Sequence, residues 1–192
     1  GAIMNWGSNS TMLVNVTLNA NSATEQGGAL YNDNGSNLWM VYVTSSGNTA
    51  LQGGGIYNAS GSYLSLSSGI FYGNTGGEIF DSSGSQAVTH SIVQGGYTGT
   101  GNLDADPLLG PLQFNGGFTQ TMALGTGSPA IDAGEAAYCP LTDQRDVSRP
   151  QGSRCDIGAY ESDATPVSMV TISGNAGAAG VTLSYVDGTP KT

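Results

Sequence analysis

The chain has 192 residues, of which 9% are charged, and its 14 acidic and 4 basic residues give a net charge of −10. So few basic residues cannot neutralise the phosphates of a nucleic acid or of an anionic membrane. We therefore expect neither nucleic-acid binding nor attachment to such membranes. No apolar run reaches the ~20 residues of a membrane-spanning helix, so we expect no membrane insertion by this segment. The 31 glycines disfavour helices and favour short strands joined by tight turns. The sequence therefore predicts an all-β protein.

A short phrase recurs in the first half of the chain. It reads GAIMN at 1–5, GGALYN at 27–32, GGGIYN at 53–58 and GGEIFD at 76–81. Its aliphatic positions are spaced by 27, 26 and 23 residues and are Ile3, Leu30, Ile56 and Ile79. A period of about 20 to 30 residues without a convincing helix is typical of a solenoid. We expect residues 1–100 to form the coils of a parallel β-helix and, because the pattern is already under way at residue 1, we expect a processed or excised segment.

Stacked coils place equivalent residues in columns about 4.8 Å apart. One column is expected to form a hydrogen-bonded ladder of polar side chains at a corner, namely Asn5, Asn32, Asn58 and Asp81. Strand alternation sends the preceding residues to the opposite face, where they are expected to form an exposed stripe of Met4, Tyr31, Tyr57 and Phe80. Three uses of this stripe remain open: coverage by the protein's own chain, stacking on sugar rings, or contact with a protein partner.

Several of these motifs also resemble a known family. GGAL (27–30), GGGI (53–56) and GGEI (76–79), together with LNAN (18–21) and FYGN (71–74), are similar to the GGA(I/L/V) and FxxN repeats of polymorphic outer membrane proteins. Members of that family are adhesin-like surface β-helices. The resemblance implies a right-handed parallel β-helix at a cell surface.

The repeat gives way at about residue 101 to GNLDADPLLGPLQFNGGFTQTMALGTGSPAIDAG, which is followed by CPLTDQRDVSRPQGSRCDIGAYE. This run, residues 101–161, resembles the terminal segment of choice-of-anchor Q domain proteins, a group of exported bacterial surface β-helix proteins, and we expect residues 101–164 to form a disulfide-containing cap segment. The family supplies no catalytic assignment to transfer. The apolar runs broken by Pro and Gly are suited to a cap that folds over the last coil of the solenoid.

Cys139 and Cys155 are the two cysteines of the chain. In an acidic chain rich in Ser, Thr and Asn we interpret them as a disulfide of an exported protein. The alternatives are two unpaired thiols or half a metal site, although no His or third Cys lies nearby to complete one. Charged residues of both signs cluster near the two cysteines, and we expect them to form a structural ion-pair knot rather than an active site. They are Asp143, Arg145, Asp146, Arg149, Arg154, Asp156 and Glu161.

Residues 165–192 follow an acidic, Pro-containing joint and resemble the opening strands of an immunoglobulin-like or carboxypeptidase-regulatory-like repeat. So few strands cannot bury a core of their own. We expect this tail to donate strands to a neighbouring copy of the chain. The apolar residues of the expected strand donor are Val170, Ile172, Val181, Leu183 and Tyr185.

Catalysis by paired carboxylates has two candidate pairs. Glu78 and Asp81 are three residues apart on a strand and are expected on opposite faces. Asp104 and Asp106 precede a proline, where an Asx-turn is the better interpretation. His90, the only histidine, is expected at the surface or at a coil edge. We therefore expect no catalytic residue, no metal site and no cofactor.

These observations predict a non-catalytic structural or adhesive module of a secreted, cell-surface protein. Its expected partners are other surface proteins or further copies of itself, joined head to tail in an extracellular filament. The alternative is a carbohydrate-binding or polysaccharide-cleaving β-helix that uses the stripe to bind glycans.

Overall fold

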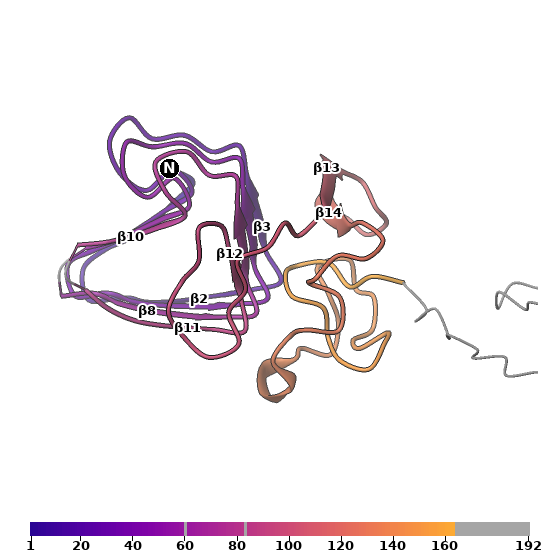
Figure 1. Cartoon of the computed structure of the whole chain (residues 1–192). Helices are drawn as coiled ribbons and strands as arrows, with labels where there is room; N and C mark the ends of the chain where they lie inside the picture. Colours follow the sequence, from indigo (N-terminus) through magenta and orange to yellow (C-terminus); the bar gives the residue numbers. More distant parts are fainter. Residues whose placement is uncertain (60, 83, 164–192) are drawn as a thin grey trace, which may run out of the picture.

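The computed structural model describes residues 1–59, 61–82 and 84–163, and its strands form a parallel β-solenoid (Figure 1). Three four-stranded sheets run along it. The first sheet contains β1 (Ile3–Asn5), β4 (Leu30–Asn32), β7 (Ile56–Asn58) and β10 (Ile79–Asp81). The second contains β2 (Ser10–Val14), β5 (Asn37–Val41), β8 (Tyr63–Ser67) and β11 (Ser85–Thr89). The third contains β3 (Thr17–Asn19), β6 (Thr44–Ser46), β9 (Ile70–Tyr72) and β12 (Ile92–Val93).

The recurring phrase sets the register of the coils. Ile3 pairs with Leu30, Leu30 with Ile56, and Ile56 with Ile79. Leu30 and Ile56 are fully buried, whereas Ile79 in the last coil is half-buried. The predicted aliphatic column and the predicted parallel β-helix are confirmed.

Alternation along the second sheet builds the rest of the core. In β5, Leu38 and Met40 are fully buried and Trp39 between them is exposed. Leu38 pairs with Leu64 and Met40 with Leu66 in the next coil. Because side chains on a strand alternate between its two faces, each coil repeats the same inward and outward positions. One set fills the solenoid and the other forms its surface.

The glycines of the phrase lie where two backbones meet. A Cβ on Gly54 would lie 2.1 Å from the carbonyl oxygen of Thr75, and one on Gly28 would lie 2.4 Å from that of Gly54. No side chain fits at such a distance, so only glycine lets successive coils stack here. Close packing of backbone on backbone therefore explains why the glycine pairs recur.

Only the start of the expected cap lies on the last coil, where Leu103 pairs with Ile92, and most of the segment lies along the side of the solenoid. Residues 105–163, here called the lateral segment, pack along the outer side of the third sheet (Figure 1). The segment contains the antiparallel strands β13 (Leu109–Gln113) and β14 (Thr121–Leu124) and the 3-10 helix η1 (Ala136–Tyr138). Ile70 and Ile92 of the third sheet pack against Ala130 and Ile157 of the segment. Outward apolar residues on a parallel sheet need a cover, and the lateral segment supplies it.

A loop just before the lateral segment covers the last coil instead. The backbone N–H of His90 donates to the carbonyl of Thr100 at 2.8 Å, and that of Leu103 donates to the carbonyl of Ser91 at 2.8 Å. Tyr97 packs against the solenoid core. This covering loop, residues 97–103, spans the boundary between the expected coils and the expected cap segment. The lateral segment that follows it lies along the side of the solenoid.

Candidate functional site

The predicted polar column lies inside the first corner as a continuous amide ladder. Asn5 Nδ2 donates to Asn32 Oδ1 at 2.8 Å, and Asn32 Nδ2 donates to Asn58 Oδ1 at 2.8 Å. Asn58 Nδ2 then donates to Asp81 Oδ1 at 2.9 Å. Every donation runs toward the C-terminal coil, and the carboxylate of Asp81 ends the series because it only accepts. The three asparagines are buried, so the ladder stabilises the coils from within.

A second amide ladder, which the sequence analysis missed, runs through another corner. Asn48 Oδ1 accepts from Asn21 Nδ2 at 2.9 Å, and Asn74 Oδ1 accepts from Asn48 Nδ2 at 2.8 Å. Asn74 then donates through its side chain and its backbone to the carboxylate of Glu78. Burial raises the pKa of Glu78, although the hydrogen bonds from Asn74 oppose that shift. The motifs LNAN and FYGN, which end in Asn21 and Asn74, were the sequence signal for this ladder.

The ladders also separate the first candidate pair of carboxylates. Glu78 ends the second ladder and Asp81 ends the first, so each carboxylate already accepts amide hydrogens. In the other pair, Asp106 Oδ1 accepts from the backbone N–H of Leu108 at 2.8 Å, which is the expected Asx-turn. Asp104 Oδ1 accepts from the N–H of Gly95 at 2.9 Å. Within residues 1–59, 61–82 and 84–163, no group of three or more His, Cys, Asp or Glu side chains is arranged to hold a metal ion.

The predicted stripe is an aromatic stack, and the expectation that it is exposed throughout is wrong at Tyr57. The rings of Tyr31 and Tyr57 are nearly parallel with centroids 5.2 Å apart, and those of Tyr57 and Phe80 are 5.3 Å apart. Tyr57 is only 7% exposed because a ring shields it on each side, whereas Met4 is 65% exposed. Burial, followed by the hydrogen bond to Asp33, raises the pKa of Tyr31 to about 12. The central ring therefore has no free face on which a sugar could stack.

A corner column attaches the lateral segment to the solenoid. Each strand of the second sheet is followed by a residue whose φ is positive, between 47° and 55°: Asn15, Tyr42, Ser68 and His90. Tyr42 donates its hydroxyl to the carbonyl of Glu135 at 2.8 Å, and Ser68 Oγ accepts from the N–H of Glu135 at 2.8 Å. His90 Nδ1 lies 2.5 Å from Glu135 Oε2. The histidine is at a coil edge, as expected, and Ser68 is fully buried. Through their contacts with Glu135, these corner residues hold the lateral segment against the solenoid.

The expected ion-pair knot lies inside the lateral segment. Arg149 Nη1 donates to Glu161 Oε2 at 3.0 Å, and the guanidinium lies 4.6 Å from the ring centroid of Tyr42. Arg145 contacts Asp143 at 2.8 Å. Both arginines are buried, whereas Arg154 is exposed and lies outside the knot. Buried, paired and hydrogen-bonded charges of this kind hold residues 143–161, in which the structure has no strand, in one conformation.

Burial raises the pKa of Asp156, next to the knot, to about 6. Its carboxylate accepts the backbone N–H of Asp132 at 2.8 Å and that of Ser162 at 2.6 Å. The predicted disulfide joins Cys139 to Cys155, with Cα atoms 6.2 Å apart, and is confirmed. This group of contacts gives the lateral segment its structure.

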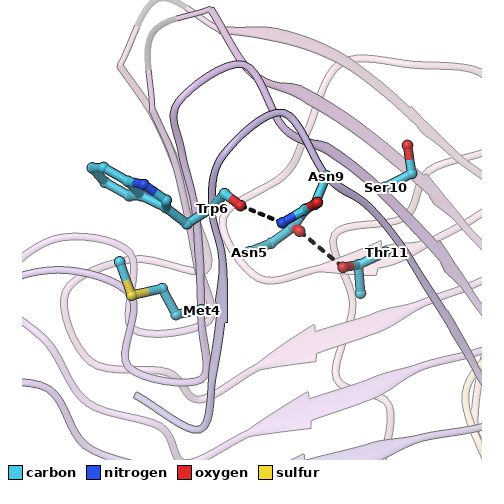
Figure 2. Close-up of a pocket in the computed structure, with 6 residues that line it drawn as sticks. All are labelled: Met4, Asn5, Trp6, Asn9, Ser10 and Thr11. Atoms are coloured by element: carbon cyan, nitrogen blue, oxygen red, sulfur yellow. Dashed lines mark hydrogen bonds between the residues drawn. The ribbon is translucent and has the colours of Figure 1, made fainter.

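The first coil has an open pocket of about 580 Å³. Figure 2 shows Trp6 and Met4 projecting to the same side of the coil, away from the polar residues of the pocket. Asn9 Nδ2 donates to the carbonyl of Trp6, and Thr11 Oγ1 donates to Asn5 Oδ1 at 2.8 Å. The ladder therefore continues into the pocket wall through a hydroxyl group.

Two expectations concern other parts of the chain. The strand donor of Val170, Ile172, Val181, Leu183 and Tyr185 lies outside the described residues. Among the helices of the described part, none has the length and apolar character needed to cross a membrane.

Fold and ladders define a parallel β-solenoid stabilised by interior amide columns. Residues 15–33 match the Chlamydia polymorphic membrane protein repeat. This stretch contains β3, the first asparagine of the second ladder, the Gly27–Gly28 step and β4. No curated protein and no solved structure matched the chain. The resemblance to the repeats of polymorphic outer membrane proteins is thereby supported for one repeat, and the resemblances of residues 101–192 stay predictions.

Proposed function

We propose that this chain is a structural and adhesive module of a cell-surface protein. The observation that carries the proposal is the polymorphic membrane protein repeat at residues 15–33, which lies within a regular parallel solenoid. Interior ladders, a stacked aromatic column and a disulfide make the module rigid. A rigid solenoid presents long, flat outer faces, which suit attachment to other surfaces.

The proposal assigns no catalytic role to the chain. Five buried or half-buried carboxylates accept hydrogen bonds from amides or arginines: Glu78, Asp81, Asp143, Asp156 and Glu161. His90 contacts a glutamate that holds the lateral segment. These contacts support structural roles for the groups that would otherwise be candidates for acid–base chemistry.

Two measurements test the proposal. Antibodies raised against the purified chain should label intact source cells, and microspheres coated with the chain should adhere to cell layers. The control coating is Leu30→Asp, which places a charge in the core and unfolds the coils. Labelling only after permeabilisation, or equal adhesion of the two coatings, would reject the proposal.

A finer proposal is that copies of the chain assemble end to end. In the described structure β1, β2 and β3 each have a strand neighbour on one side only. Inward residues of the first coil, such as Leu13, are half-buried, whereas the equivalent Met40 is fully buried. Unpaired strand edges recruit further strands. Because residues 97–103 cover the opposite end, the donated strand would come from residues 165–192.

Sedimentation and electron microscopy of the full chain test this assembly. Leu13→Lys places an inward-pointing charge at the open edge and should abolish filaments. Gln86→Lys makes the same charge change in β11 of the last coil and should leave filaments intact. A wild-type chain that sediments as a monomer would eliminate the assembly proposal and leave adhesion untouched.

A further inference from the structure

The outer face of the second sheet is a regular surface that the described lateral segment leaves free. In Figure 1 the lateral segment lies beside the third sheet, and no described segment lies against the outer side of β2, β8 and β11. This face carries the outward residues that alternate with the core of the second sheet. It is separate from the aromatic stack on the first sheet and adjoins the pocket in Figure 2 at Ser10.

Two aromatic rings and a thioether form an apolar patch on this face, which we call the Trp39 face: Met12, Trp39 and Tyr63. The rings of Trp39 and Tyr63 meet edge to face, with centroids 6.4 Å apart and planes at 65°. Met12 is the register neighbour of Trp39 in the preceding coil. Met12 is 65% exposed and Trp39 is 37% exposed. Unlike Tyr57, Trp39 therefore keeps part of its ring surface in solvent.

None of the outward residues of the four strands of the second sheet is charged, although the chain as a whole has a net charge of −10. Hydroxyl and amide groups lie around the Trp39 face instead, together with the aliphatic side chains of Val14, Val41 and Ala87. The outward residues are Ser10, Met12, Val14, Asn37, Trp39, Val41, Tyr63, Ser65, Ser67, Ser85, Ala87 and Thr89.

A neutral glycan matches this combination of groups. The C–H face of a pyranose ring is apolar and packs on an exposed indole or phenol, and its hydroxyl groups exchange hydrogen bonds with Ser, Thr and Asn. Binding sites for small polar ligands commonly combine aromatic surface with a few polar groups. A charged glycan or the charged rim of a protein would find no counter-charge here. The uncharged character of the face therefore selects a neutral sugar chain.

We propose that the Trp39 face binds a neutral glycan, with Trp39 as the stacking residue and Asn37 and Ser65 as hydrogen-bonding residues. This inference rests on the proposed adhesive function and names its ligand class. It replaces the Tyr31, Tyr57 and Phe80 stripe as the carbohydrate surface, because the stack leaves its central ring only 7% exposed.

The test is an array of neutral oligosaccharides (glucans, mannans, xylans and galactans) probed with the full chain, followed by calorimetric titration of the best binder. Trp39→Ala should weaken binding about tenfold, the loss expected when one aromatic contact is removed. Raising the salt concentration from about 0.05 M to about 0.5 M should leave the affinity nearly unchanged, because no ion pair contributes.

Trp6→Ala is the matched control, because Trp6 is 50% exposed and lies outside the second sheet. It should bind as the wild type does, and both variants should keep the wild-type melting temperature and far-UV dichroism. The inference is overturned if no neutral oligosaccharide binds, if Trp39→Ala binds normally, if Trp6→Ala loses as much affinity, or if salt abolishes binding. Microspheres that adhere to cells in any of these cases would leave the adhesive function standing and reject only its glycan ligand.

Discussion

Asn32 donates its buried side-chain amide to Asn58 in the next coil at 2.8 Å. The same Nδ2 also lies within hydrogen-bond distance of the carbonyl of Tyr63, at 3.1 Å, and Asn32 Oδ1 accepts from Asn5. One side chain thus links three coils and two sheets. A column of such residues fixes the register in which the coils stack, because a shifted coil would leave buried amides without partners.

The first prediction concerns this amide. Asn32→Leu keeps the volume but leaves Asn5 Nδ2 and Asn58 Oδ1 without their partner, so we expect a loss of about 2–4 kcal/mol in the free energy of unfolding. Chemical denaturation followed by circular dichroism measures it. Gln86→Leu, which removes an exposed amide from β11, should change stability by less than about 0.5 kcal/mol. Equal losses in the two variants would show that the ladder does not stabilise the coils.

The second prediction concerns the ion-pair knot. Arg149→Met leaves the fully buried carboxylate of Glu161 without its cation, and we expect a loss of about 3–5 kcal/mol. Hydrogen exchange should show the lateral segment losing protection first, for example at the N–H of Ile157, which bonds to the carbonyl of Ala130. Arg154→Met, at an exposed position, is the control and should change little. Unaltered protection in Arg149→Met would contradict the role of the knot.

The third prediction concerns pH. Because burial raises the folded-state pKa of Asp156 to about 6 from its ordinary value of 3.8, the folded state binds this proton more tightly than the unfolded state does. This group's contribution therefore favours folding at low pH and is lost as pH rises from about 4 through about 6, by on the order of 3 kcal/mol. Asp156→Asn should flatten stability over that window, whereas Glu25→Gln, at an exposed position, should not. Denaturation midpoints at a series of pH values provide the measurement, and identical pH profiles for Asp156→Asn and the wild type would disprove the assignment.

The fourth prediction concerns the disulfide. Replacing Cys139 and Cys155 together by serine opens a loop that spans 16 residues, and we expect a loss of about 3 kcal/mol. Thermal unfolding with and without a reducing agent checks the result. The reducing agent should destabilise the wild type and leave the double variant unaffected. A double variant as stable as the oxidised wild type would show that the knot alone holds this loop.

Position in the repeat decides which features the sequence could predict. The aliphatic column and the first amide ladder followed from residues that recur at fixed places in each coil, where one conformation repeats. The position of the lateral segment did not follow, because its contacts join residues as far apart as Asn15 and Thr142 and repeat no pattern. The burial of Tyr57 was missed for a similar reason. Strand alternation gives the direction of a side chain but not the shielding by the rings stacked above and below it.

The stacking of like residues over like is the claim on which the ladders, the stack and the Trp39 face all depend. Selective methyl labelling of Ile and Leu, read by nuclear Overhauser effects in solution, tests it most directly. The register predicts cross-peaks from Leu30 to Ile56 and from Ile56 to Ile79. Absence of both cross-peaks in the folded protein, with Ile56 close instead to residues outside this column, would contradict the account.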